Sequence, residues 1–167
     1  MTSARSQLGW SRVHLSLGSN LDSPAEQVDS AIAALDEDAQ ITVCMASRKY
    51  STEPMGVRDQ PRFINVAVEI ETALEPLALL DTVQEIETEL GREPSPRWGP
   101  RSIDIDIVLW GDRIVREKRL TVPHPEWRRR AFVLTPLAEI APDAEDPVTG
   151  MTVAALAARP EAVGGVR

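Results

Sequence analysis

The order of strand-like and helix-like segments is the feature that most constrains how this chain folds. Apolar residues alternate with period two, as in half-buried strands, in four segments: 12–18, 39–47, 63–71 and 101–110. Two helical segments separate these strands. One starts at Ser23-Pro24 and runs to about Leu35, and the other covers 76–90, with Gly91 just past its end. The order strand-helix-strand-strand-helix-strand predicts a ferredoxin-like α+β sandwich with a largely antiparallel sheet.

Further segments are appended to this core. Residues 48–52 are expected to extend the sheet beyond a bulge, and a tight Gly-Asp turn at 111–112 leads into another strand. Residues 131–142 are typical of a helix interrupted by Pro136. A short helix is expected over 153–158. Appended strands and C-terminal helices therefore complete the predicted fold.

The length of 167 residues suits a single domain with a full hydrophobic core. We expect that domain to span 1–167, with a core over about 12–145, an N-terminal extension (1–11) and a variable C-terminal tail (146–167). No apolar run approaches the length of a membrane span, and the first residues lack the apolar core of a signal peptide. These features predict a cytoplasmic protein without a membrane partner.

The charge distribution separates a basic segment from an acidic remainder. The formal net charge of −8 disfavours a nucleic-acid partner. Residues 92–130 nevertheless hold ten Lys and Arg against six Asp and Glu. Cations around carboxylates are typical of a site for a metal-bound polyanion such as a nucleoside triphosphate. A solvated basic surface with a few ion pairs accounts for the charge alone equally well.

Two carboxylates, Asp104 and Asp106, interrupt the last strand of the core. The apolar residues that alternate with them are Ile103, Ile105, Ile107 and Leu109, and the isoleucines are expected to face the core. Side chains two residues apart on a strand share a face, and burying close like charges is costly unless cations neutralise them. Mg²⁺ prefers oxygen ligands and is completed by water and substrate phosphates. Two such ions can hold both the attacking and the leaving oxygen of a phosphoryl transfer.

The Asp-x-Asp pattern is unspecific by itself, because it also occurs in glycosyltransferases and polymerases. A metal-dependent nucleotidyltransferase or cyclase and a ligand-binding sensor of the same fold both stay open on this pattern. The sequence has no phosphate-binding loop of the Walker type, no kinase signature and no G-x-G-x-x-G motif. Two irregular Pro-rich stretches, 53–62 and 92–101, are expected to form mobile lids over the site.

A third carboxylate is misplaced in the helix predicted for 76–90. An ideal helix puts Glu87 within the apolar stripe of Val83 and Ile86, and Gln84 at its edge. A buried glutamate is either paired with a nearby arginine or holds a polar ligand. Both interpretations stay open.

Zinc and disulfide chemistry are not expected. Cys44 is the single cysteine and lies in an apolar run, so we expect a small buried core residue in a reducing compartment. His14 and His124 lack the paired spacing of zinc ligands. His14 is expected to be a structural hydrogen-bonding residue. His124, between prolines in the basic segment, is the better functional candidate.

Five blocks of the sequence carry a further signal: "LSLGSNLDSP", "STEPMG", "DQPRFINVAV", "RWGPRSIDIDIVLWG" and "LTVPHPEWRRRAFVLTPLAEIAP". Together they closely resemble the hydroxymethyl-dihydropterin pyrophosphokinase family of folate biosynthesis over about residues 12–145. The resemblance implies a ferredoxin-like sandwich that transfers pyrophosphate from ATP to the hydroxymethyl group of a reduced pterin and releases AMP. It implies two Mg²⁺ ions on Asp104 and Asp106. We expect a stand-alone, monomeric enzyme without a fused aldolase or synthase domain.

The resemblance also implies a pterin site. Asn65 would pair with the ring edge through its side-chain amide, and Phe63 and Phe132 would stack on the ring. Backbone hydrogen bonds to the pterin would come from Thr52, Glu53, Pro54 and Met55. The strand pattern agrees, because Phe63 and Asn65 share a face.

The nucleotide side of the site is implied in the same way. The residues expected to be catalytic are Arg92, Trp98, Arg101, Asp104 and Asp106. The residues expected to line the ATP site are Gln84, Glu87, Arg92, Trp98, Arg101, Ile107, Arg119, Thr121, His124 and Arg130. Arg92 and Trp98 belong to the loop that would close over the reactants. This block disfavours a sensor, which has no need of two metal carboxylates.

Overall fold

A five-stranded antiparallel sheet in the order β2-β4-β1-β5, with β3 also paired to β4, forms the centre of the molecule. The computed structural model describes residues 9–20, 23–52, 63–91 and 103–159. The strands are β1 (Ser11–Ser19), β2 (Ile41–Ala46), β3 (Tyr50–Thr52), β4 (Phe63–Thr72) and β5 (Asp104–Trp110). This order confirms the predicted ferredoxin-like α+β fold and the extension of the sheet by β3.

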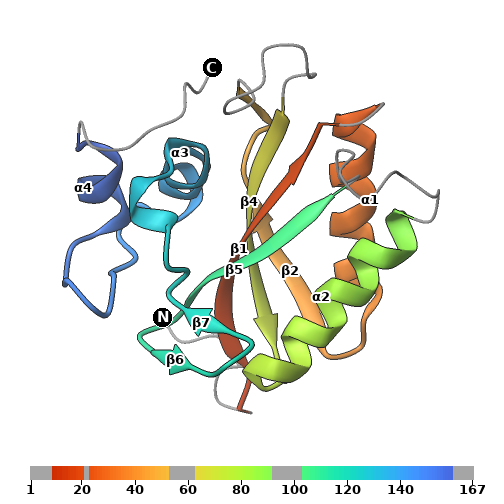
Figure 1. Cartoon of the computed structure of the whole chain (residues 1–167), viewed down its shortest axis with the longest axis horizontal. Coiled ribbons are helices and arrows are strands. Elements are labelled where there is room, and N and C mark those ends of the chain that lie inside the picture. The colour runs from red at the N-terminus through yellow and green to blue at the C-terminus, as the bar shows by residue number, and fades with distance from the viewer. Residues whose placement is uncertain (1–8, 21–22, 53–62, 92–102, 160–167) are drawn as a thin grey trace.

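Helices cover both faces of the sheet. Figure 1 shows α1 (Pro24–Glu37) and α2 (Pro76–Leu90) on one face and α3 (Ala131–Ile140) and α4 (Val153–Ala157) on the other. The remaining elements are a hairpin of β6 (Val115–Arg116) and β7 (Thr121–Val122) and a 3₁₀ turn, η2 (Trp127–Arg129). None of the helices in the described residues combines the length and apolar character needed to cross a membrane.

The ends of α1 and α2 follow from local sequence. Each helix begins with a proline, whose fixed φ suits the first helical position. The backbone N–H of Gly91 donates to the Glu87 carbonyl and closes α2. Both helices are confirmed, and α1 continues past the predicted end at Leu35 to Glu37.

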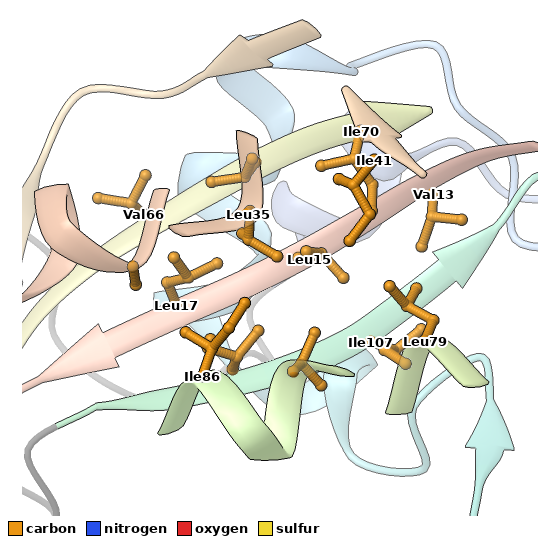
Figure 2. Packing of buried hydrophobic residues seen from close by; sticks show 14 of the residues in the cluster. Val13, Leu15, Leu17, Leu35, Ile41, Val66, Ile70, Leu79, Ile86 and Ile107 are labelled. Atoms are coloured by element: carbon orange, nitrogen blue, oxygen red, sulfur yellow. The ribbon is translucent and has the colours of Figure 1, made fainter. Parts of the chain in front are cut away.

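The sheet face toward α1 and α2 carries the first core cluster. Leu15 and Leu17 of β1, Leu35 of α1, Leu79 of α2 and Ile107 of β5 are almost completely buried, and they pack around one another in Figure 2. Burying one such side chain is worth about 1.5–3 kcal/mol. The cluster therefore holds both helices against the sheet.

The opposite face carries a second core cluster built with α3 and α4. Leu134 and Leu137 of α3, Val153 and Leu156 of α4 and Trp127 of η2 are buried there. Two of these residues, Val153 and Leu156, fall in the segment expected to be a variable tail. The chain up to α4 is therefore an integral part of the core.

The expected interruption of α3 at Pro136 is wrong. The helix runs continuously from Ala131 to Ile140 with Pro136 inside it and buried. Proline removes one backbone N–H, which costs a helix about 3 kcal/mol. Burial of Pro136 together with Leu134 and Leu137 offsets that loss.

Cys44 is exposed, so the expectation of a buried core residue is also wrong. The pairing of β2 with β4 shifts register between Val43 and Met45, and Cys44 is the extra residue in this bulge. The β2 strand lies at the edge of the sheet, and its last residues, Cys44, Met45 and Ala46, are exposed. Partial desolvation by its neighbours is the first cause that raises the pKa of the Cys44 thiol, and the charges of Glu71 and Glu69 raise it further.

A second bulge changes the face of Leu109. Opposite β1, His14 pairs with Leu109 and Leu15 pairs with Ile107, which leaves Val108 as the extra residue. Ile107 belongs to the first cluster, whereas Leu109 belongs to the second. The period-two alternation that the sequence shows through Leu109 therefore does not hold past Val108, because an inserted residue reverses the alternation after it.

Candidate active site

The paired carboxylates lie in the first half of β5, on the sheet face that α3 and α4 cover. Asp104 lies opposite Gly18 and Asp106 opposite Ser16 on the neighbouring strand β1. Both carboxylates are half-buried, and the intervening Ile105 points into the first core cluster. The alternation of the strand thus separates a polar face from the packed face.

The candidate pterin residues lie on the other side of β1. Asn65 of β4 pairs with the same Gly18, and Phe63 pairs with Thr52 of β3. Residues directly opposite one another in an antiparallel sheet share a face. Two strand spacings separate the backbones of Asn65 and Asp104, which is about 10 Å. One row of the sheet therefore carries the Asn65 amide, Gly18 and the Asp104 carboxylate.

The segment before α3 brings His124 to the carboxylates. The His124 N–H donates to the Val108 carbonyl (3.1 Å), directly after the Asp-x-Asp stretch. The Glu126 N–H donates to His124 Nδ1 (3.1 Å), so Nε2 carries the proton of the neutral ring. Burial lowers the pKa of His124, and the Arg130 charge adds to this effect while the Asp106 charge opposes it. A neutral imidazole with an Nε2–H donor follows for pH 7.

Arg130 and Phe132 add a cation and an aromatic ring on the same face of the sheet. The Arg130 guanidinium lies over the Phe132 ring, 5.5 Å from its centroid, in a cation–π contact. Phe132 is the second residue of α3, whose later residues fill the second core cluster. The helix thus fixes an aromatic ring and a cation on the covered face of the sheet.

Candidate nucleotide residues on α2 lie at the free edge of β5. Glu87 Oε2 accepts a hydrogen bond from the Ile105 N–H (3.0 Å), which points out of this edge strand. Arg119 donates to Gln84 Oε1 (3.4 Å) and to Asp81 Oδ1 (2.6 Å). The structure therefore links α2 both to the carboxylate strand and to the β6–β7 hairpin.

The remaining candidates are placed less favourably or fall outside the described residues. The Ile107 side chain is buried in the first cluster, so only its backbone is available to a nucleotide. Thr121 is exposed at the start of β7. The candidates outside the described residues are Glu53, Pro54, Met55, Arg92, Trp98 and Arg101.

Sequence reasoning missed a bridge between α3 and the pterin strands. Glu139 Oε1 accepts hydrogen bonds from the Tyr50 hydroxyl (2.5 Å) and from Arg48 Nε (2.8 Å), and Glu139 Oε2 accepts from the Arg48 N–H (2.8 Å). The hydrogen bond from Tyr50 is the first cause of the lowered pKa of Glu139. Tyr50 opens β3, which ends at Thr52. No local sequence pattern predicts this contact, because the partners lie about ninety residues apart.

Gly18 was also missed, although its position in a strand is a recognisable signal. A glycine inside a strand often marks a close approach of neighbouring groups. An ideal Cβ at Gly18 would lie 2.7 Å from Asn65 Oδ1. Gly18 is therefore part of the candidate site because its missing side chain leaves room for the Asn65 carboxamide.

Two further polar side chains, Arg128 and His14, make structural contacts. Arg128 donates through both Nε and Nη2 to Asp146, whose side chain is 0% exposed. His14 Nε2 pairs with Glu69 Oε1 (3.0 Å), as expected for a structural histidine, and this hydrogen bond lowers the Glu69 pKa. His14 also lines a pocket of about 450 Å³ at the opposite end of the sheet. Neither Asp104 nor Asp106 lines that pocket.

Comparison with known proteins identifies the group to which this arrangement belongs. Residues 14–142 match the family described as 7,8-dihydro-6-hydroxymethylpterin-pyrophosphokinase. A Pseudomonas aeruginosa protein named 2-amino-4-hydroxy-6-hydroxymethyldihydropteridine pyrophosphokinase is 46% identical over 132 residues, covering 79% of this chain and 82% of the relative. A Bacillus subtilis protein of the same name is 44% identical over 136 residues, covering 81% of each chain.

Solved structures show the same fold at lower identity. The wild-type HPPK-DHPS of Plasmodium falciparum with pteroate superposes with a TM-score of 0.72 at 16% identity. The match covers 89% of this chain and 42% of the longer Plasmodium chain, so this chain spans less than half of that protein. The match over residues 14–142 and the two relatives above 40% identity establish that the chain belongs to the 7,8-dihydro-6-hydroxymethylpterin-pyrophosphokinase family.

Proposed function

We propose that this chain transfers the pyrophosphoryl group of ATP to the hydroxymethyl group of 6-hydroxymethyl-7,8-dihydropterin and releases AMP, a step of folate biosynthesis. Family membership supports the reaction. The observation that carries it structurally is the row in which Asn65 and Asp104 flank Gly18 on one sheet face. A ring held at Asn65 would present its substituent toward the carboxylates.

The donor set of the site fits Mg²⁺. Within the described residues no group of three or more His, Cys, Asp and Glu side chains gathers to hold a metal. Asp104 and Asp106 would contribute carboxylate oxygens, and phosphate oxygens and water would complete the coordination, as is usual for Mg²⁺. We propose two ions at these residues. When bound, Mg²⁺ supplies positive charge that neutralises the carboxylates and the phosphates.

The pterin would be held between Phe63 and Phe132, with its ring edge on the Asn65 amide. Phe63 and Asn65 come from one face of β4, and Phe132 comes from the helix that covers this face. The backbone of 52–55 is proposed to bind the ring as well. These contacts orient the hydroxymethyl group, and orientation alone can supply much of the rate enhancement of a bimolecular reaction.

The transfer would proceed by in-line attack. The pterin hydroxyl oxygen forms a bond to the β-phosphorus, and the bond from this phosphorus to the oxygen shared with the α-phosphorus breaks. AMP leaves with that oxygen, and the hydroxyl proton is released to water. His124 would donate its Nε2–H to a phosphate oxygen and Arg130 would place its charge beside it, so both stabilise developing negative charge.

The other nucleotide contacts are proposed around this centre. Gln84, Glu87 and Arg119 would contact the nucleoside end, supported by their grouping at the β5 edge. Thr121 and the Ile107 backbone are proposed as further contacts. The proposed closing residues are Arg92, Trp98 and Arg101. Exclusion of water by such closure protects the reaction from hydrolysis.

The decisive experiment incubates the purified chain with ATP, Mg²⁺ and the hydroxymethyl pterin and separates the nucleotides by chromatography. AMP and a pyrophosphorylated pterin should form in equal amounts. Release of pyrophosphate instead would identify a nucleotidyltransferase or cyclase. Pterin binding without any nucleotide turnover would identify a sensor, and either result overturns the proposal.

We further propose that the chain acts as a single-domain monomer in the cytoplasm, without a nucleic-acid or membrane partner. The net charge of −8 supports the absence of a nucleic-acid partner. Light scattering behind a sizing column tests the monomer, since a dimer would give twice the mass of 18.4 kDa.

A further inference from the structure

Gly18 occupies the centre of the proposed site, between the two strands that carry its functional groups. It pairs with Asn65 on β4 and with Asp104 on β5. A substrate that reaches from the amide to the carboxylates must therefore lie over Gly18. The identity of this residue decides how much room the substrate and the Asn65 side chain have.

The backbone does not require a glycine at this position. Among the described residues, the glycines with positive φ are Gly9, Gly111 and Gly150, and Gly18 is not one of them. Gly18 lies in a regular stretch of β1 that pairs on both sides. An L-residue would fit this backbone and would even favour the strand, because glycine weakens strand interiors by roughly 0.5–1 kcal/mol.

The space above Gly18 does require a glycine. An ideal Cβ there would lie 2.7 Å from Asn65 Oδ1, 3.7 Å from Asn65 Cγ and 3.8 Å from the Ile64 carbonyl oxygen. Real Cβ contacts essentially never fall below 3.0 Å, so the Asn65 carboxamide would have to move. Asn65 is only 4% exposed, which leaves few other positions for its side chain.

We propose that Gly18 is a positioning residue for pterin recognition, because its missing side chain leaves the space in which the Asn65 carboxamide stands toward the ring edge. This inference rests on the proposed function and adds a residue whose role is steric. A carboxamide pairs with a ring edge through a donor and an acceptor at set positions. A Cβ at position 18 that pushes the Asn65 carboxamide out of its place would therefore break this pairing.

The variant Gly18→Ala tests the proposal through pterin binding. Titration calorimetry with the hydroxymethyl pterin, in the presence of Mg²⁺ and a non-hydrolysable ATP analogue, should show a dissociation constant raised about 10- to 100-fold. The affinity for the ATP analogue alone should stay within about twofold, because the displaced group lies on the pterin side. The melting temperature should change little, because the better strand propensity of alanine offsets part of the cost of displacing the Asn65 carboxamide.

Gly150→Ala is the matched control. Gly150 has a φ of 77° and nothing within 4 Å of an ideal Cβ, so it is required for conformation and not for space. This variant should lose thermal stability and keep its pterin affinity. The two glycine variants should thus show opposite patterns of stability and binding.

A double-mutant cycle with Asn65→Ala keeps the test decisive. If Gly18 acts through Asn65, adding Gly18→Ala to Asn65→Ala should change pterin affinity by less than about twofold. If Gly18→Ala alone does not fold, the double variant should fold, because the clashing atom is gone. Unchanged pterin affinity of a folded Gly18→Ala, equal losses for pterin and ATP analogue, or an unfolded double variant each overturn the inference.

Failure of the inference is distinct from failure of the proposed function. A wild-type chain that neither binds the pterin nor releases AMP would refute the function itself. A wild-type chain that turns over normally, beside a Gly18→Ala variant with normal pterin affinity, would refute only the role of Gly18.

Discussion

The ion pair between Arg128 and Asp146 gives the sharpest test of the energetics. Asp146 is 0% exposed, and it also accepts hydrogen bonds from the Val148 N–H (2.9 Å) and the Thr149 hydroxyl (2.9 Å). Burial acts to raise its pKa, but the hydrogen bonds from Arg128, Val148 and Thr149 outweigh burial and lower it to about 2. Relative to the ordinary value of 3.8, this shift corresponds to about 2.5 kcal/mol of stabilisation at neutral pH.

Replacing the carboxylate should therefore be costly. Asp146→Ala leaves the Arg128 guanidinium and two further donors without their acceptor, and we expect a loss of about 3 kcal/mol of unfolding free energy at pH 7. For a chain of this size that is a fall of about 6–12 °C in melting temperature. The exposed Asp143 supplies the control, since Asp143→Ala should change stability by less than about 0.5 kcal/mol.

The pH dependence gives an independent check. A carboxyl group whose pKa is lower in the folded state stabilises the fold above its unfolded pKa. That stabilisation is lost as the pH falls from 3.8 through about 2. Urea unfolding of the wild type and of Asp146→Ala should therefore differ most near pH 7 and converge near pH 2. Equal midpoints at pH 7, or a gap that persists undiminished at pH 2, would refute this reasoning.

Three further predictions concern catalysis and the core. Asp106→Ala should reduce AMP release at least about 100-fold at an unchanged melting temperature, and near-normal release would rule out its proposed metal role. Arg92→Ala should lower kcat by about 100-fold and pterin affinity by less than about threefold; an unchanged kcat in steady-state kinetics would argue against a role of this loop residue in the transition state. Leu15→Ala, in the centre of the first cluster, should cost about 2–5 kcal/mol in denaturant unfolding, and a loss below about 1 kcal/mol would show that the cluster can collapse around the gap.

The regular part of the fold could be predicted from the sequence because its signals are local. Period-two strands, helices that begin at Pro24 and Pro76, and a glycine after the second helix are all present within short windows. The position of Cys44 could not be predicted in this way. Its bulge depends on how β2 pairs with β4, and a pattern within β2 alone contains no information about its partner.

The candidate site shows the same division. The sequence pattern indicated that Glu87 breaks an apolar stripe, and the structure gives it the Ile105 N–H, a backbone partner that composition cannot reveal. The Glu139 bridge to Arg48 and Tyr50 joins segments far apart in the sequence, so only the packing of α3 on the sheet brings it about. Pro136 was misjudged because its helix-breaking tendency is local, whereas the packing that overrides it is not.

The extra residue at Val108 has a consequence for how β5 can change during evolution. Before it, the strand presents Asp104 and Asp106 to the site, and after it Trp110 turns to the first cluster. Deleting that one residue would close the bulge and leave the later residues on the faces they now occupy, because their pairing with β1 already skips Val108. A homologue without it would therefore keep the polarity of those positions, and a sequence alignment that places the gap elsewhere in this strand will assign the residues between that gap and Val108 to the wrong faces.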